Sequence, residues 1–246
     1  MSVLDGQRAL VTGASGAIGG ELALALARRG VRLVLSGRNR ERLEATAERA
    51  RAEGAEVRAV AGDLTDDQAL GRLADAAVDG EGRAGGVDLL LHALGAYRAG
   101  AVAETPPDVL DHQLRVNLRV PYELTRRLLP SLRARRGQIV FVNSSAAVRP
   151  RGPVSAYAAS KAALAALANC LRDEVNPDGV RVLSVFPGRT ASAMQEEVHR
   201  FEGRPYDPAR FLQPSEVAGT IVHALELPPT AEVTDLHIRP AYPPQG

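Results

Sequence analysis

Short runs of apolar residues alternate along the chain with longer segments in which apolar positions recur at helical spacing. The apolar runs are continuous, which is the pattern of strands buried on both faces of a parallel sheet. The predicted strands are Arg8–Thr12, Arg32–Ser36, Glu56–Ala61, Asp88–Leu91, Gln138–Asn143, Arg181–Phe186 and Glu232–Ile238. The predicted helices are Ala17–Arg29, Arg40–Glu53, Asp66–Val78, a long helix from Thr105 to about Arg135, Val154–Val175, Met194–Phe201 and Ser215–Leu225.

This order of elements predicts a doubly wound α/β fold with about seven strands and helices on both faces of the sheet. No linker or internal repeat divides the sequence, so we expect residues 1–246 to form one domain. The glycine-rich segment Gly80–Gly86 is predicted to be a loop, and Thr105 is predicted to cap a helix that has Pro106 at its first position. Ligands bind at the carboxyl ends of the strands in such sheets, so polar residues there are candidates for function.

Composition excludes several classes of function. Apolar residues make up 45% of the chain and the formal net charge is +1, so we expect no nucleic-acid or membrane partner. The N-terminal segment has no apolar core of a signal peptide, which favours a cytoplasmic location. Cys170 is the only cysteine, so neither an intrachain disulfide nor a cysteine metal cluster is expected. His112, His199, His223 and His237 show no metal-ligand spacing, so we predict no metal site.

A glycine-rich turn follows the first predicted strand, and its sequence is Thr-Gly-Ala-Ser-Gly-Ala-Ile-Gly over residues 12–19. Glycine permits a tight turn and close approach to a pyrophosphate, while the following helix offers free N–H groups at its N-terminus. The position between the first strand and the first helix predicts a dinucleotide-binding loop, with a purely structural turn as the alternative. The expected contacts are Gly13, Ser15, Gly16, Ile18 and Gly19.

The residues after the second and third strands bear on the choice of dinucleotide. NAD-binding proteins place an acidic residue after the second strand to hold the ribose 2′-OH, whereas an arginine there suits a 2′-phosphate. Gly37 leaves space and Arg38 supplies charge, so NADP(H) is the predicted cofactor, with a solvated arginine as the alternative. Asp63 and Leu64 follow the third strand, where the carboxylate would accept from the adenine amine or else cap a loop.

The only lysine of the chain lies one helical turn after a tyrosine. Tyr157 and Lys161 are four residues apart, so they share a face of the predicted helix. A tyrosine has a pKa near 10, and a neighbouring ammonium lowers that pKa by favouring the phenolate. Arginine cannot replace a compact ammonium in this role. The pair therefore predicts Tyr157 as a general acid/base assisted by Lys161.

Two further polar residues are candidates for the same site. Ser144 ends the fifth strand, where its hydroxyl would hydrogen-bond a substrate oxygen. Its neighbour Ser145 is a rival for that role, and a turn cap is the structural alternative for either serine. Asn117 lies inside the long predicted helix, where asparagine is mildly unfavourable, so it has either a specific role or an ordinary surface position.

The chain resembles the short-chain dehydrogenase/reductase family along nearly its whole length. Residues 157–161, Tyr-Ala-Ala-Ser-Lys, are similar to the family's YxxSK signature, and Ser144 and Asn117 precede Tyr157 at the family's usual spacing. The resemblance implies a Rossmann-type domain with an Asn–Ser–Tyr–Lys tetrad. In it Tyr157 is the proton donor in reduction and Ser144 polarises the carbonyl. Lys161 lowers the Tyr157 pKa and holds the nicotinamide ribose, and Asn117 anchors a proton-relay water.

The resemblance also implies cofactor contacts after the later strands and likens residues 37–38 to the NADP-preferring classical members. The further contacts are His92, Ala93, Gly95, Pro187, Gly188 and Thr190. Three departures stand out. Ala17 replaces the middle glycine of the TGxxxGxG pattern, residues 92–95 retain only the glycine of NNAG, and the last strand lacks the family's VDGG ending. We expect His92 to be a structural replacement, with a role in chemistry as the alternative.

These residues predict an NADP(H)-dependent oxidoreductase that transfers hydride between nicotinamide and a small-molecule carbonyl or secondary alcohol. Two alternatives stay open: a non-catalytic NADP-binding sensor or partner subunit, and an epimerase or dehydratase that uses bound cofactor. The long segment Arg189–Leu212 is predicted to be the substrate lid, and Tyr97 and Arg98 to line the pocket. The resemblance implies a homo-oligomer, either a dimer or a tetramer.

Overall fold

The apolar runs lie side by side in one parallel sheet. The structure is a computed structural model that describes residues 2–80 and 85–241. The strands are β1 (Arg8–Thr12), β2 (Arg32–Gly37), β3 (Val57–Ala61), β4 (Leu89–His92), β5 (Gln138–Val142), β6 (Arg181–Pro187) and β7 (Asp235–Ile238). Their order is β3-β2-β1-β4-β5-β6-β7, which confirms the predicted doubly wound sheet of about seven strands. The strand order reverses between β1 and β4, the place where such sheets bind ligands.

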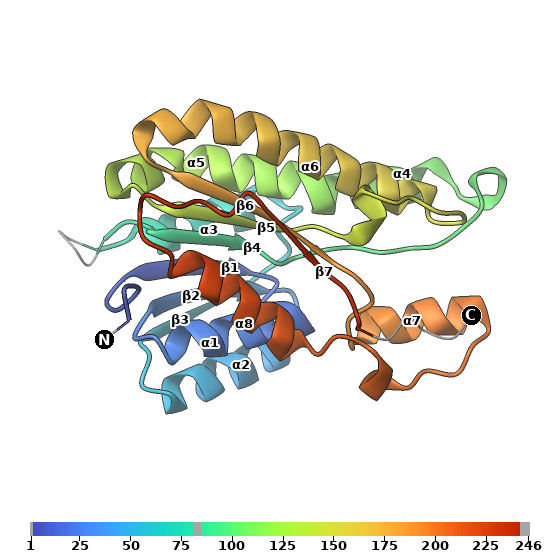
Figure 1. Ribbon diagram of the computed structural model, residues 1–246, viewed down its shortest axis with the longest axis horizontal. Coiled ribbons are helices and arrows are strands. Elements are labelled where there is room, and N and C mark those ends of the chain that lie inside the picture. The colour runs from blue at the N-terminus through green and yellow to red at the C-terminus, as the bar shows by residue number, and fades with distance from the viewer. Residues whose placement is uncertain (1, 81–84, 242–246) are drawn as a thin grey trace.

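Helices cover both faces of the sheet (Figure 1). They are α1 (Ala17–Ala27), α2 (Arg40–Ala52), α3 (Asp67–Val78), α4 (Pro107–Leu114), α5 (Val120–Arg135), α6 (Ser155–Val175), α7 (Ala193–Glu202) and α8 (Pro214–Leu225). Leu22 of α1 and Ile221 of α8 belong to the apolar core on one face, and Leu128 of α5 and Leu164 of α6 belong to the core on the other. None of the helices in the described ranges is long and apolar enough to cross a membrane.

The long helix predicted from Thr105 is interrupted and begins one residue later than expected. Pro106 is the N-cap and α4 starts at Pro107. A π-helical turn, Arg115–Arg119, then separates α4 from α5 and contains Asn117. Such a turn inserts a residue without removing apolar positions, so the apolar spacing of the sequence does not reveal it, although π-turns are frequent at functional sites.

The last strand is shorter than the predicted Glu232–Ile238, because a side chain takes the place of backbone pairing at its start. Glu232 Oε1 accepts from Val182 N at 2.7 Å, and Glu232 Oε2 accepts from Asn176 Nδ2 at 2.9 Å. Backbone pairing with β6 consequently begins at Asp235. In the predicted loop Gly80–Gly86, residues 81–84 lie outside the described part of the chain.

Candidate active site

The turn between β1 and α1 packs closely against the end of β4. Gly13 has φ +71°, and a Cβ at this position would lie 2.6 Å from the carbonyl oxygen of Ala93. A Cβ on Gly19 would collide with the carbonyl of Gly13 itself. Both positions therefore require glycine, and the backbone of the turn remains open to close approach by a ligand.

The N-terminus of α1 faces this turn with no side chain capping it. Gly16 is the N-cap residue and makes no side-chain cap hydrogen bond. Ala17, which departs from the family pattern, is exposed, so its methyl group is not buried within the turn, while Ile18 packs against the core. A helix end of this kind presents free N–H groups and a partial positive charge to an anion.

The residues expected to select the dinucleotide lie at the ends of β2 and β3. Gly37 lies against Ser15, where a Cβ would collide with the Ser15 hydroxyl, and Arg38 next to it is exposed. Asp63 is also exposed, and its Oδ1 accepts from Thr65 N at 2.9 Å and Thr65 Oγ1 at 2.8 Å. The backbone hydrogen bond from Thr65 is the main cause that lowers the pKa of Asp63, and the Arg38 charge adds to it. Leu64 is buried.

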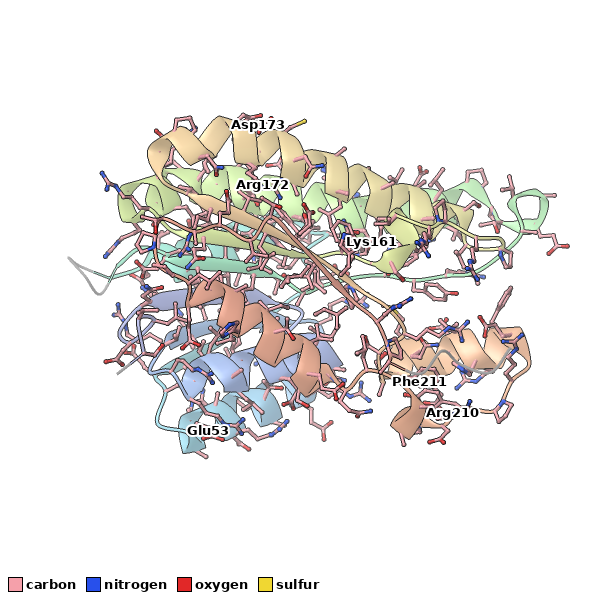
Figure 2. The ribbon with its side chains drawn as sticks, viewed as in Figure 1. Glu53, Lys161, Arg172, Asp173, Arg210 and Phe211 are labelled. Atoms are coloured by element: carbon pink, nitrogen blue, oxygen red, sulfur yellow. The ribbon has the colours of Figure 1, made fainter. Side chains whose placement is uncertain are left out.

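Lys161 is buried on α6 and reaches the end of β5. Its Nζ donates to the carbonyl oxygen of Val142 at 3.0 Å, and only 3% of the residue is exposed. Burial lowers the pKa of Lys161 to about 8, because a low-polarity surrounding disfavours the ammonium. Figure 2 shows Lys161 on α6, on the side of the molecule from which α7 extends.

The expected lowering of the Tyr157 pKa by Lys161 is wrong for this structure. Burial raises the pKa of the Tyr157 phenol, and a side-chain hydrogen bond with Ser144 opposes that rise. The Lys161 ammonium is engaged by Val142 instead. Tyr157 is therefore a protonated phenol at neutral pH with a hydroxyl neighbour.

The structure favours Ser144 over its neighbour Ser145. Ser144 is half-buried and hydrogen-bonded with Tyr157, whereas Ser145 is exposed. The Ser144 Oγ also accepts from Ala146 N at 3.1 Å, at the start of a short 3₁₀ turn. Ser144 therefore does both: it caps this turn, which was the structural alternative, and it contacts Tyr157.

Asn117 ties the loop after β4 to α6. Its Oδ1 accepts from Ala96 N at 2.8 Å, and its Nδ2 donates to Ala96 O and to Ser160 Oγ, both at 2.9 Å. Ser160 in turn donates to the carbonyl of Tyr157 at 2.7 Å. Sequence reasoning did not assign Ser160 a role, although its place in the YxxSK signature was a signal. A Cβ on Gly95 would lie 3.6 Å from Asn117 Oδ1 and 3.9 Å from Lys161 Nζ.

His92 is enclosed at the end of β4. It is 1% exposed, its ring stacks on Phe141 at a centroid distance of 5.0 Å, and its Nε2 lies 2.9 Å from Thr125 Oγ1. Burial, reinforced by the Lys161 charge, lowers the pKa of His92 to about 3, so the ring is neutral at physiological pH. This environment favours the structural interpretation of His92 and leaves only its backbone for a cofactor contact.

The segment after β6 begins the predicted lid. Gly188 N donates to Ile238 O at 2.7 Å, which fixes the end of β6 after Pro187. Thr190 is 7% exposed, and its Oγ1 donates to the carbonyl of Gly188 at 3.1 Å. Within residues 2–80 and 85–241, no three His, Cys, Asp or Glu residues group in a way that could hold a metal ion.

Tyr97 packs directly on the candidate acid/base. The two tyrosine rings meet edge to face with a centroid distance of 5.0 Å and an interplanar angle of 73°. Tyr97 is half-buried, whereas its neighbour Arg98 is exposed. Of the two residues predicted to line the pocket, Tyr97 contacts Tyr157 through its ring and Arg98 is exposed to solvent.

Comparison with known proteins shows the family of the chain. A family model described as short chain dehydrogenase matches residues 7–203. An uncharacterized short-chain type dehydrogenase/reductase, y4eK from Sinorhizobium fredii, is 33% identical over 244 residues, covering 94% of this chain and 90% of that protein.

Solved structures extend the match over almost the whole chain. A crystal structure of an actinorhodin polyketide ketoreductase variant with NADPH has a TM-score of 0.87 at 26% identity and covers 98% of each chain. A 3-oxoacyl (acyl-carrier-protein) reductase from Agrobacterium tumefaciens C58 with NADP bound has a TM-score of 0.86 at 27% identity, covering 97% of this chain and 95% of that one. The predicted class of cofactor accords with these NADP(H)-bound structures. The chain belongs to the short-chain dehydrogenase/reductase family of oxidoreductases.

Proposed function

We propose that the chain is an NADP(H)-dependent reductase of a carbonyl compound, or dehydrogenase of the matching secondary alcohol, with Tyr157 as general acid/base. The observation that carries the proposal is the convergence of Ser144, Tyr157 and Lys161 at the end of β5. The Asn117 side chain donates a hydrogen bond to Ser160 of α6, the helix that carries Tyr157 and Lys161.

The residues around the β1–α1 turn fit a dinucleotide. Gly13 and Gly19 leave no side chain in the turn, and α1 presents its uncapped N-terminus there. Arg38 is exposed beside Gly37 and suits a 2′-phosphate, which is why we propose NADP(H) in preference to NAD(H). When bound, the cofactor supplies or accepts the hydride. The residues proposed to hold it are Gly13, Ser15, Gly16, Ile18, Gly19, Arg38, Asp63, Leu64, His92, Ala93, Gly95, Tyr157, Lys161, Pro187, Gly188 and Thr190.

The protein groups move one proton. Because burial raises the pKa of Tyr157, its phenol is protonated at neutral pH, as a proton donor to a carbonyl oxygen must be. Ser144 would hydrogen-bond the same oxygen and polarise the carbonyl, and its hydrogen bond with Tyr157 would stabilise the phenolate left after proton transfer, whereas Lys161 would hold the nicotinamide ribose. In the oxidative direction the phenolate takes the proton back from the alcohol, so the same residues serve both directions.

Titration with NADPH and with NADH tests the cofactor half of the proposal. Wild type is expected to bind NADPH more tightly, and Arg38→Ala to lose about tenfold or more in NADPH affinity while NADH affinity stays the same, since a charge-assisted contact contributes about 1.5–3 kcal/mol. Arg40→Ala, which removes an exposed arginine two residues further along, is the matched control. Failure to bind either nucleotide would refute the proposal.

Turnover of a ketone panel tests the chemical half. Tyr157→Phe is expected to retain NADPH binding and to lose about 10²–10⁴-fold in kcat, because the phenyl ring has no proton to give. Tight NADPH binding without turnover of any ketone or alcohol would support the non-catalytic sensor instead. Product formation without net NADPH consumption would support the epimerase or dehydratase.

A further inference from the structure

The segment Arg189–Leu212, here called the lid, is held together by contacts of its own. Its two ends are joined by hydrogen bonds from Ala191 N to Leu212 O at 2.8 Å and from Leu212 N to Arg189 O at 3.1 Å. Arg189 also pairs through both guanidinium nitrogens with the carboxylate of Glu202 at the end of α7. These contacts close the lid on itself and do not use the apolar side chains of α7.

One face of α7 fills the interior of the lid. Gln195 and His199 are 7% and 5% exposed. The His199 ring lies 5.0 Å from the Phe211 ring and 5.4 Å from the Tyr206 ring, measured between centroids. Packing of the lid is thus accounted for by this face and by the residues that follow α7.

The remaining apolar residues of α7 form a second stripe. Met194, Val198 and Phe201 follow one another at spacings of four and three residues, so they share a helix face that is not the face of Gln195 and His199. Met194 is 36% exposed and Phe201 is 51% exposed, although both are large apolar side chains. At a rise of about 1.5 Å per residue, the stripe extends about 10 Å from Met194 to Phe201.

The stripe starts at the catalytic centre. A Cβ on Gly95 would lie 4.0 Å from Met194 Cε and 3.9 Å from Lys161 Nζ, so the Met194 methyl and the Lys161 ammonium both lie beside Gly95. Figure 1 shows α7 beyond the end of the sheet.

Tyr97 also lies close to α7. After burial, the charges of Glu202 and Glu197 are among the causes that raise the pKa of Tyr97, which places these lid carboxylates near its phenol. Glu197 lies next to Val198 and one turn before Phe201, so it belongs to the side of α7 that carries the stripe. Tyr97 therefore contacts Tyr157 and lies near carboxylates of α7.

We propose that the stripe Met194–Val198–Phe201 binds an unbranched apolar chain of the substrate, so that the enzyme acts on ketones or alcohols whose functional group is near one end of such a chain. This inference rests on the proposed function, because Tyr157 fixes the position of the carbonyl. The occupant is assigned as substrate because Met194, at one end of the stripe, lies beside Gly95 together with Lys161. An extended chain advances about 1.2 Å per bond, so a stripe of about 10 Å accommodates about eight carbon atoms beyond the carbonyl.

Turnover of 2-alkanones of increasing length, from 2-butanone to 2-dodecanone, measures the proposed contact. We expect kcat/KM to rise about two- to fourfold per methylene until the chain reaches Phe201 at about 2-decanone, and then to level off. Phe201→Ala is expected to lower the ratio of kcat/KM for 2-decanone over 2-butanone about tenfold, and Phe201→Leu to restore most of it. Val3→Ala, which trims an exposed apolar residue at the N-terminus, is the control that should leave the ratio unchanged.

Calorimetric titration with N-alkylformamides separates failure of this inference from failure of the proposed function. These amides carry a carbonyl that NADPH does not reduce, so their Kd reports the chain contact even if the protein reduces no ketone. A Kd that tightens with chain length in wild type but not in Phe201→Ala supports the inference whether or not turnover occurs. Equal Kd values at all lengths would overturn it, and so would a change of oligomeric state in Phe201→Ala, which would assign the stripe to a second copy of the chain.

Discussion

At the scale of single residues, composition pointed to the acid/base because a chain rich in arginine keeps one lysine, and that lysine follows Tyr157 by one helical turn. The direction of the Tyr157 pKa was mispredicted. Spacing along a helix places two side chains on one face but does not say how deeply the phenol is buried or that Val142 holds the ammonium. Burial depends on β5 and the loop after it, which are distant in sequence.

Burial of Lys161 predicts a dependence of stability on pH. The folded-state pKa is about 8 and the ordinary value is 10.5, so between these pH values the unfolded chain binds more protons than the folded chain. The free energy of unfolding should therefore rise with pH across this window, by about 3 kcal/mol relative to Lys161→Met, and the difference should be flat below pH 8. Urea unfolding of both proteins at pH 7, 8, 9 and 10.5 measures this. Since Lys161 is the only lysine, parallel curves would show that its ammonium remains solvated in the folded state.

At the scale of elements, continuous apolar runs located the strands to within a few residues, because strands buried on both faces leave little choice of side chain. The break between α4 and α5 was missed, since a π-helical turn keeps the apolar face continuous. In the sequence, the only sign of this break was Asn117, because asparagine is unfavourable in a helix interior. The structure explains its presence by three hydrogen bonds, which hold Ala96 and Ser160.

Removal of these hydrogen bonds should affect both stability and turnover. Asn117→Ala leaves the Ala96 backbone and the Ser160 hydroxyl short of partners, which should lower the free energy of unfolding by about 3 kcal/mol. It should also lower kcat by about tenfold or more, because α6 and the loop after β4 lose the connection that fixes their relative position. Asp66→Ala is the control, since it removes the N-cap bond to Ala69 of α3, costs about 1 kcal/mol and should leave kcat unchanged. Urea unfolding and steady-state kinetics report the two effects, and wild-type kcat in Asn117→Ala would contradict the positioning role.

At the scale of the whole molecule, two apolar cores lie on opposite faces of one sheet; Leu212 at the end of the lid belongs to one of them, whereas the ring contacts of His199, Tyr206 and Phe211 lie outside both. The sequence indicated the lid by its length and its mixture of aromatic and charged residues. It did not show which of those residues pack inside and which face the site, because helical spacing alone makes both faces of α7 equally plausible interiors. The structure distinguishes the two faces of α7, because Gln195 and His199 are buried whereas Met194 and Phe201 are exposed.

If the lid is a separate unit, its core can be loosened without unfolding the sheet. Phe211 is 7% exposed and contacts the rings of His199 and Tyr206, yet it belongs to neither of the two large cores (Figure 2). Phe211→Ala should therefore accelerate tryptic cleavage at the exposed Arg200, Arg204 and Arg210 about tenfold or more, since local opening governs such cleavage.

The urea midpoint of the sheet should change little in this variant. Leu128→Ala, in the core under α5, is the matched cavity variant. It should lower the free energy of unfolding by about 2–5 kcal/mol without selective cleavage in the lid. A fall in global stability in Phe211→Ala as large as that in Leu128→Ala would mean that the lid unfolds only with the sheet. In that case α7 would be a fixed wall of the site, and substrate would enter past it without lid opening.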